Sequence, residues 1–571
     1  MFFRLLGNLV RCLFLPLRVL RRSRVLPQDG LVHLTIDGPV ADIVAPARFW
    51  ERWRPRPLAL GDLTRLVRDV TNDPRARGLL LTLRSFRGGM ASASSLHAVL
   101  AKIAAAGKEL VVHLPLGGDT KEIYLASAGT RVFVGPQAIL APLGFAASVR
   151  YVRRALDRAG IEPEVFARGR FKSAGEQLVR ESMSDAQREQ LGALLDVFYA
   201  AFVEAVAKGR KLDPERVKAI VDGAPYLAGD AVAAGLVDGA AYEDEIPGLL
   251  AKGDARPAIV EASRYLRAMR ATELRPLRAR PALGVIRVHG PIASQSQVVQ
   301  AGATDERIIA AVRAARKDPR IAAVVLHVDS PGGSALASDR MHHELEQLAA
   351  EKPLVAYFGD VAASGGYYVA APAHAIVAQP TTITGSIGVV AARVVVEPLL
   401  ARLGVTTEVL KRGAHADSHE ATRHLSDEEK ASFERELEGM YRAFVGIVAR
   451  GRKRSVEEIE RLAQGRVWSG LDGMREGLVD TLGGFDVACE RARELARARL
   501  GDRAKELEPL VVRGGRHPIP PLDPPARVVS AALGLLERAV PQLNLDVAIA
   551  LAGGRERVLA WCELATILGR T

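Results

Sequence analysis

Residues 354–370 read LVAYFGDVAASGGYYVA. The apolar run from Leu354 to Phe358 predicts a buried strand, and small residues after a Gly-Asp turn lead into an apolar segment of helical length. Ser364 lies at that junction, directly before a Gly-Gly pair. A serine there is close to the unpaired N–H groups of a helix N-terminus, which favour developing negative charge. A simple N-cap serine has the same position, so the rest of the chain must distinguish a structural serine from a nucleophile.

The composition is that of a globular protein with several domains. The chain has 571 residues, of which 48% are apolar and 25% charged, and its net charge is +12. Basic residues gather near the ends and in one central linker, and no nucleic-acid-binding motif accompanies them, so we expect a negatively charged membrane surface and no nucleic acid as partner. Cys12, Cys489 and Cys562 are far apart in the sequence, which predicts neither a disulfide framework nor a metal site. No cofactor is expected.

The N-terminal residues 1–28 form a basic apolar segment. Arg4, Arg11 and Arg18 recur at heptad spacing among leucine, phenylalanine and valine. The longest charge-free run, Cys12 to Leu17, is far shorter than the roughly 20 residues that span a bilayer. The pattern favours an amphipathic helix lying in the membrane interface. The alternative is a helix packed on its own protein or on a neighbouring subunit.

The chain repeats itself at a spacing of roughly 245 residues, which is the signature of a duplicated structural unit. Each copy alternates short apolar runs with helical stretches, and this alternation predicts parallel sheets with crossover helices. The order and spacing of the matching segments are held throughout, so we interpret them as a tandem duplication. The matching pairs are Gly30–Val40 with Gly284–Ile292, Asp73-Pro-Arg with Asp318-Pro-Arg, Gly88-Gly89 with Gly332-Gly333, Tyr124 with Tyr368, Gly209-Arg-Lys211 with Gly451-Arg-Lys453, and Gly235–Asp238 with Gly477–Asp480.

The predicted organisation follows from these repeats. A membrane-associating segment (1–28) precedes a first α/β unit (29–260), a basic linker (261–281), a second α/β unit (282–500) and a C-terminal extension (501–571). Within the extension, amphipathic helices are predicted at Val528–Leu536 and Val547–Trp561.

The two copies differ at the positions where chemistry is expected. Ser364 of the second copy aligns with Thr120 of the first, and Lys172 of the first aligns with Ala416 of the second. A duplication that divided one two-residue site would leave this pattern. We therefore predict one complete site where the units meet, formed either within one chain or across a subunit boundary.

A serine and a lysine are sufficient for acyl transfer. The hydroxyl is a weak nucleophile and needs a base within roughly 2.6–3.2 Å. Lysine is a base only when neutral, so its pKa must fall from about 10.4 toward about 7–8, as burial in an apolar site achieves. Phe171 and Ala174 flank Lys172 and suit such a site, and Ser173 is a candidate to orient the amine.

The segment Asp329–Gly333, Asp-Ser-Pro-Gly-Gly, follows a predicted strand and supplies possible oxyanion donors. A Pro-Gly-Gly turn exposes backbone N–H groups with little steric cover. The N–H of Gly332 or Gly333, together with that of Gly365, is expected to hold an oxyanion. The alternative is an ordinary turn. Residues after Gly333 are also placed to pair with an extended peptide by strand addition.

Together with Thr384–Gly388 and Phe171–Ser173, these motifs resemble the long, two-unit form of the bacterial signal peptide peptidase A family over about residues 29–500. The resemblance implies an α/β fold of two tandem Clp protease/crotonase-like ββα superhelix units with helical extensions. It also implies Ser364 as nucleophile, Lys172 as general base and an oxyanion donor at Gly332 or Gly333. The family forms membrane-bound homotetramers that degrade released signal peptides and other short or unfolded chains.

The resemblance therefore predicts a serine endopeptidase at the inner (cytoplasmic) membrane. Family members of this length begin with an uninterrupted transmembrane anchor, whereas arginines interrupt residues 1–26 here, so spanning and sidedness stay open. The alternatives are a crotonase-like acyl-CoA enzyme and a non-catalytic membrane scaffold. Retention of both dyad partners argues against the scaffold, and no basic, glycine-rich CoA site is evident in the sequence. His342-His343-Glu344 lacks the spacing of a zinc motif.

Overall fold

The computed structural model describes residues 24–44, 58–271, 280–294, 302–514 and 558–562, together with Asn8 and Cys12. Most of the predicted interfacial segment 1–28, and the predicted helix at 528–536, lie outside these residues. The chain divides into two compact units, Met1–Ala146 with Asp196–Pro281, and Ala147–Leu195 with Ala282–Thr571. The segment that carries Lys172 belongs to the first repeat in sequence, but it is part of the second compact unit.

The second compact unit is organised around a mostly parallel sheet of apolar strands. Strands β16 (Ile321–Ser330) and β18 (Leu354–Ala363) are buried along nearly their whole length. Parallel strands covered on both faces require such continuous apolar runs, which explains why the opening stretch of the sequence lies at the centre of this sheet. The strand order is β22-β20-β18-β16-β13-β24, and β19 and β23 continue the sheet from β18. The remaining strands are β13 (Ala282–His289), β19 (Ala375–Ala378), β20 (Ile383–Gly385), β22 (Val467–Ser469), β23 (Thr481–Leu482) and β24 (Glu508–Val511).

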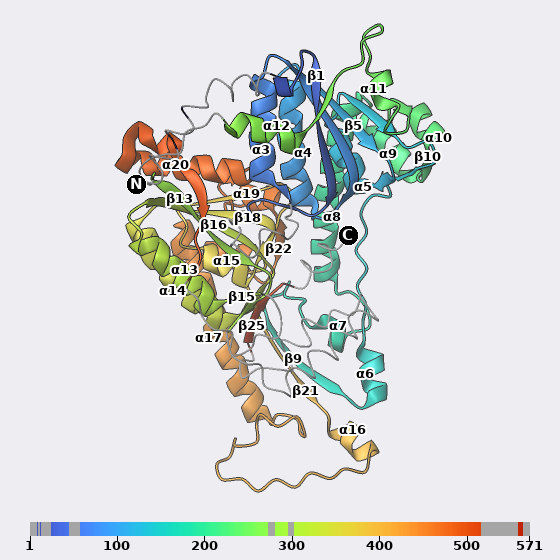
Figure 1. The fold of residues 1–571 in the computed structure, drawn as a ribbon. Helices are drawn as coiled ribbons and strands as arrows, with labels where there is room; N and C mark the ends of the chain where they lie inside the picture. The colour runs from blue at the N-terminus through green and yellow to red at the C-terminus, as the bar shows by residue number, and fades with distance from the viewer. Residues whose placement is uncertain are drawn as a thin grey trace. The chain divides into compact units, whose positions relative to one another are not determined.

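Helices of this unit pack against the sheet and form the hydrophobic core with it (Figure 1). Leu326, Met341, Phe358, Tyr367 and Phe444 are all fully buried in one cluster. Burial of a large apolar side chain stabilises a fold by about 1.5–3 kcal/mol, so this cluster is a principal source of stability. The helices are α13 (Asp305–Lys317), α14 (Ala335–Glu351), α15 (Gly365–Ala370), α17 (Asp427–Arg452), α18 (Val456–Leu462), α19 (Gly470–Arg475) and α20 (Phe485–Leu500), followed by the 3₁₀ helix η3 (Gly501–Glu506).

The main sheet of the first compact unit has the order β11-β7-β5-β4-β1-β12. This order corresponds to the path β23-β19-β18-β16-β13-β24 through the sheet of the second unit. The strands of this sheet are β1 (Gly30–Gly38), β4 (Ala76–Phe86), β5 (Glu109–Leu114), β7 (Arg131–Val134), β11 (Gly239–Ala240) and β12 (Ile259–Glu261). A small second sheet contains β6 (Gly117–Asp119), β8 (Ile139–Ala141) and β10 (Tyr226–Leu227). A further pair is formed by β2 (Val40–Ala41) and β3 (Leu58–Ala59). The helices of the first unit are α3 (Leu60–Asn72), α4 (Met90–Ala105), α5 (Thr120–Ala126), α9 (Pro214–Asp222), α10 (Ala228–Ala233), α11 (Ile246–Leu249) and α12 (Ala262–Ala271), and α8 (Asp185–Arg210) runs from the second unit into the first.

An ion pair that occurs once in each unit supports the duplication. Arg210 Nη2 donates to Asp238 Oδ1 at 2.8 Å, and Asp238 Oδ2 accepts from the backbone of Val132 at 2.7 Å. In the second unit, Arg452 Nη2 donates to Asp480 Oδ1 at 2.6 Å, and Asp480 Oδ2 accepts from the backbone N–H of Ile376 at 2.7 Å. The sequence repeat paired these arginines and these aspartates, and the structure gives both pairs the same bonding pattern.

A further sheet in the second unit has the order β15-β14-β17-β25-β21-β9. In it, β9 and β21 form a long antiparallel arm that carries α6 and α16 at its far end, with α7 close to its base (Figure 1). The elements are β9 (Glu162–Arg168), β14 (Ile292–Ala293), β15 (Ala303–Thr304), β17 (Gly332–Ser334), β21 (Val389–Val395), β25 (Val558–Trp561), α6 (Arg153–Ala159), α7 (Glu176–Val179) and α16 (Glu397–Arg402).

The prediction of a helix at Val547–Trp561 is wrong for its last residues, because Val558–Trp561 is the strand β25. A short apolar run fits a buried helix or a strand equally well, and only the partners of its backbone decide between them. Here β17 and β21 supply those partners on both edges.

Candidate active site

Ser364 lies at the C-terminal end of β18 and is the residue before the first turn of α15. Its backbone has φ 54° and ψ −117°, a conformation that costs a non-glycine residue about 1–3 kcal/mol. The surrounding structure holds it there, since the Ser364 N–H donates to Gly385 O at 2.8 Å and its carbonyl accepts from Tyr368 N at 2.9 Å. Such strain typically accompanies a side chain that must project from a tight strand-to-helix turn.

The second glycine after Ser364 lets this turn pack closely. A Cβ on Gly366 would lie 2.7 Å from the carbonyl oxygen of Ser330, at the end of β16. Only a residue without a side chain allows the helix N-terminus to approach that strand end. The Gly-Gly pair therefore positions α15, and its unpaired first N–H groups, beside the serine.

Lys172 reaches the same place from the segment that follows β9. Its Nζ lies at a hydrogen-bonding distance of 2.9 Å from Ser364 Oγ, and the Ser364 hydroxyl also lies 3.4 Å from Gly388 O. Both side chains are buried, with Lys172 5% exposed and Ser364 0% exposed. The structure thus brings the predicted pair to hydrogen-bonding distance within one chain and within one compact unit.

Buried contacts fix the backbone around Lys172. Gln190 Nε2 donates to Phe171 O at 3.0 Å and to Ser173 Oγ at 3.2 Å, while its Oε1 accepts from Val467 N at 3.1 Å. The guanidinium of Arg466 lies 4.8 Å from the centre of the Phe171 ring. Gln190 and Arg466 together connect the lysine segment to β22, and no sequence motif predicts either role.

Ser386 contacts the Lys172 amine, for which Ser173 was predicted as the orienting residue. Lys172 Nζ donates to Ser386 O and to Ser386 Oγ, both at 3.1 Å, whereas the Ser173 hydroxyl accepts from Gln190. Lys172 and Ser173 lie in a run of tight turns, in which the Lys172 N–H donates to Gly169 O at 3.1 Å and the Ser173 N–H donates to Phe171 O at 2.9 Å. Ser386 lies inside the Thr384–Gly388 motif, which is the signal that could have identified it.

We expect Ser386→Ala to lower kcat about tenfold, the equivalent of one hydrogen bond of roughly 1.4 kcal/mol. The backbone carbonyl of Ser386 still holds the amine, so the loss should be partial. Because Ser386 has φ 52°, Ser386→Gly is the matched variant that also removes the hydroxyl but relieves the backbone. Equal losses in peptide-ester hydrolysis assign the effect to the hydroxyl. Full activity in the glycine variant would contradict the orienting role.

The Pro-Gly-Gly turn forms β17, and β17 contacts α15. The Gly332 N–H donates to Ser330 Oγ at 3.2 Å. Gly333 has φ 151°, and a Cβ there would lie 2.0 Å from the carbonyl oxygen of Ile292, so glycine is required. Gly365 is the first residue of α15, where a helix leaves its N–H without an intrahelical partner. The three predicted donors therefore lie in adjoining elements around the serine.

Thr120 and Ala416, the residues that align with Ser364 and Lys172 in the opposite copies, do not form a second pair of this kind. Thr120 begins α5 behind a capping box formed by Asp119 and Glu122, and its hydroxyl bonds to the backbone of Gly144. Ala416 is exposed. Among the described residues, no group of three His, Cys, Asp or Glu side chains is arranged to hold a metal ion.

Comparison with known proteins assigns the chain to a family. The model of peptidase family S49 matches residues 103–255 and, a second time, residues 346–499. The chain belongs to peptidase family S49. The two S49 matches agree with the tandem duplication, and the family confirms the prediction of a serine peptidase of the long, two-unit type.

Three relatives extend over most of the chain. Serine protease SPPA, chloroplastic, of Arabidopsis thaliana is 32% identical, over 84% of this chain and 71% of its own length. Protease 4 of Salmonella typhi is 32% identical, over 77% of this chain and 72% of its own length. Protease 4 of Haemophilus influenzae is 28% identical, over 84% of this chain and 81% of its own length. The similarity therefore includes both repeats of this S49 peptidase.

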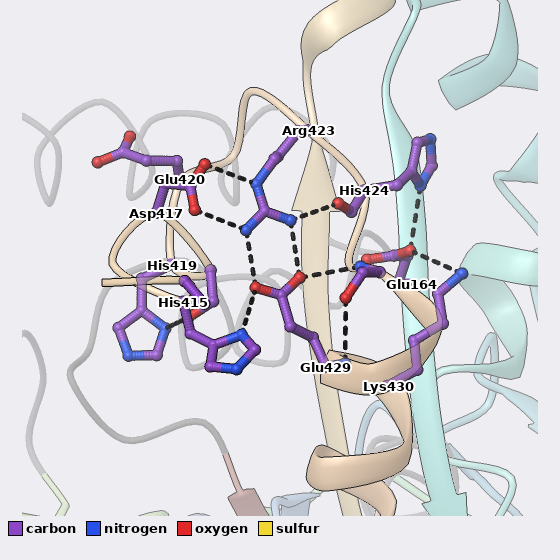
Figure 2. A network of polar contacts seen from close by, with 12 residues as sticks. Glu164, His415, Asp417, His419, Glu420, Arg423, His424, Glu429 and Lys430 are labelled. Carbon is purple, nitrogen blue, oxygen red and sulfur yellow. Dashed lines mark hydrogen bonds and ion pairs between the residues drawn. The ribbon is translucent and has the colours of Figure 1, made fainter. Parts of the chain in front are cut away.

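A network of hydrogen bonds and ion pairs joins the loop before α17, which contains Asp417, Arg423 and His424, to the β9–β21 arm (Figure 2). Arg423 donates to both carboxyl oxygens of Asp417 and of Glu429, at 2.8–2.9 Å. His424 lies 2.7 Å from Glu162 and 3.0 Å from Glu164, both on β9. The side-chain hydrogen bond to Glu164 is the largest cause that raises the pKa of His424 above its ordinary 6.5, and Glu162 adds to it.

The network predicts a pH-dependent contribution to stability. A raised folded-state pKa means that the His424 contribution is fully present below about pH 6.5 and is lost as the pH rises through the higher folded-state value. We expect His424→Gln to lower the melting temperature at about pH 5.5 and to change it little at about pH 8.5. His419→Gln is the control, because that ring contacts the neutral hydroxyl of Ser418. A deficit of equal size at both pH values would contradict the prediction.

Proposed function

We propose that this serine peptidase is a membrane-associated endopeptidase that cleaves signal peptides and other short or unfolded chains, with Ser364 as nucleophile and Lys172 as general base. The observation that carries the proposal is the buried contact of 2.9 Å between Lys172 Nζ and Ser364 Oγ. A nucleophile and a base at this distance satisfy the first geometric requirement of covalent acyl transfer.

The acylation step follows from that contact. Neutral Lys172 takes the proton of the Ser364 hydroxyl as Oγ attacks the peptide carbonyl carbon. The carbonyl oxygen gains the negative charge, and the N–H groups of Gly365 and of Gly333 or Gly332 stabilise it. The C–N bond then breaks, and the protonated Lys172 gives its proton to the leaving amine. An acyl ester on Ser364 remains.

Deacylation uses the same groups in reverse. A water molecule loses a proton to Lys172 and attacks the ester carbonyl, which again forms an oxyanion in the same place. The C–O bond to Ser364 breaks, and Lys172 returns the proton to Oγ. The carboxylic acid product leaves, and serine and lysine regain their starting states. Ser386, through its hydroxyl and its carbonyl, keeps the amine directed at Oγ throughout.

We also propose the Clp protease/crotonase-like superhelix for each unit, and the division into 29–260 and 282–500 as the extent of the duplicated repeats. Parallel sheets with crossover helices and a second layer of short strands support the first assignment. The paired arginine–aspartate contacts support the second.

Membrane association and a homotetramer belong to the same proposal. The net charge of +12 and the basic residues of segment 1–28 support attraction to an anionic lipid surface. Among the described residues, α8 is long and apolar enough to cross a membrane, and 39% of its apolar window, including Leu194, Phe198 and Phe202, is buried within the protein. Cosedimentation with anionic vesicles, with and without residues 1–28, and light scattering of the detergent-solubilised chain test these points.

The decisive test of the function is peptide hydrolysis by the full chain. Casein and peptide esters should be cleaved, and a fluorophosphonate should label wild type but not Ser364→Ala. A peptide corresponding to a released signal sequence should be cut into fragments by wild type alone. An inert wild type, with normal circular dichroism and normal size, would overturn the proposal.

A further inference from the structure

Strand β25 occupies a slot between two strands of the second unit. It pairs antiparallel with β17, opposite Gly332 to Ser334, and antiparallel with β21, opposite Val390 and Ala391. An extended peptide held on both edges in this way has the geometry of strand addition, in which backbone groups supply most of the affinity. Residues of the chain's own C-terminal segment thus occupy a position in the sheet that another extended peptide could occupy by the same backbone pairing.

The register of β25 relates it to the oxyanion turn. Cys562 N donates to Pro331 O at 2.8 Å, so these two residues form a hydrogen-bonded pair. In an antiparallel ladder such pairs alternate with non-bonded ones, which makes Gly333 and Ala560 the next pair whose amides and carbonyls face each other. The Ala560 carbonyl therefore faces the N–H of Gly333, one of the groups predicted to hold the oxyanion.

The remaining neighbours of β25 also belong to the site. It contacts α15, the helix that begins directly after Ser364, and α14, which follows β17. Its other partner, β21, begins at Val389, beside Gly388, whose carbonyl lies 3.4 Å from the Ser364 hydroxyl. Cys562, at the end of the strand, is 2% exposed. A peptide in this slot thus lies along the elements that carry the nucleophile and the oxyanion donors.

We infer that Val558–Cys562 is a tethered competitor of the substrate, bound in the peptide slot between β17 and β21, and that substrates bind there as an antiparallel strand after displacing it. This inference rests on the proposed function. The affinity comes from backbone pairing, so the slot accepts extended chains of varied sequence. An occupant on the same chain competes at a high effective concentration, and the apparent KM equals the intrinsic KM divided by the fraction of time that the slot is free.

The test compares chains with and without β25. Deletion of residues 558–571 removes the strand, and deletion of 563–571 is the matched control that keeps it. Ala560→Pro removes a ladder donor without shortening the chain, since both edges of β25 are paired, and Ala560→Ser is its control. We expect kcat/KM for peptide esters to rise about tenfold in the deletion and in Ala560→Pro, mainly through KM, with both controls at the wild-type value.

A binding measurement makes the result independent of catalysis. A fluorescein-labelled peptide of residues 557–563, RVLAWCE, should bind the 558–571 deletion carrying Ser364→Ala, and RVLPWCE should not. Unlabelled RVLAWCE should inhibit the deletion variant competitively and the wild type less. Equal kcat/KM in all four variants, with no peptide binding, would overturn the inference while leaving the protease intact. Peptide binding without any hydrolysis would overturn the proposed function and retain the slot.

Discussion

Lys172→Met is expected to lower kcat/KM for peptide esters by about ten-thousand-fold, a loss similar to that of Ser364→Ala. Methionine is unbranched like lysine, only one heavy atom shorter and apolar enough to stay buried, so the variant should fold, but it cannot take the Ser364 proton. Lys172→Arg should be equally inactive, because a guanidinium retains its charge and cannot serve as the base. The measurement is hydrolysis together with fluorophosphonate labelling and thermal unfolding.

Two controls separate this effect from a general loss of positive charge. Lys317 is an exposed lysine at the end of α13, and Lys317→Met should leave hydrolysis at the wild-type level. The double variant Ser364→Ala with Lys172→Met should be no worse than either single variant, because the two residues act as one unit. Near-normal hydrolysis by Lys172→Met would show that a different base serves Ser364.

Gly465→Ala should produce the second largest loss, about a hundredfold in kcat/KM, although Gly465 has no chemical role. A Cβ at this position would lie 2.6 Å from Lys172 Cβ and 2.7 Å from Lys172 N, and the glycine has φ +73°. The lysine backbone has to move away, which takes Nζ out of line with Ser364. A displacement of about an ångström at a reacting group is sufficient for a loss of this size.

The control for this prediction is another glycine of the same unit. Gly439 lies within α17, and a Cβ there would meet no atom within 4 Å. Gly439→Ala should therefore keep full activity and stabilise the helix by about 0.5–1 kcal/mol. If Gly465→Ala keeps its activity as well, the amine does not depend on close packing around the Lys172 backbone.

The sequence was sufficient for features that depend on local pattern. Continuous apolar runs predicted the strands around Leu326 and Phe358, and the repeat paired Arg210 with Arg452 before either contact was known. Ser364 and Lys172 emerged because each lacks a counterpart in the other copy. These features can be predicted because apolar runs and repeats are properties of the order of residues along the chain.

Features that depend on distant partners could not be predicted in this way. The strand character of Val558–Trp561 comes from β17 and β21, which lie far away in sequence. Gln190 and Gly465 support Lys172 only because the fold brings three separate segments together. Proximity in sequence predicts Ser173 beside the amine, whereas Ser386, which contacts the amine, follows Lys172 by more than two hundred positions.

The order in which the dyad residues occur along the chain has a consequence for biosynthesis. Lys172 is translated within Ala147–Leu195, whereas Ser364 and the strands that surround it belong to Ala282–Thr571. Under the proposed mechanism, a nascent polypeptide that has left the ribosome only as far as Pro281 holds the proposed base and lacks the proposed nucleophile. The proposed dyad therefore forms only after the later half has been made and has packed around the earlier lysine, and on this mechanism an unfinished chain has no peptidase activity.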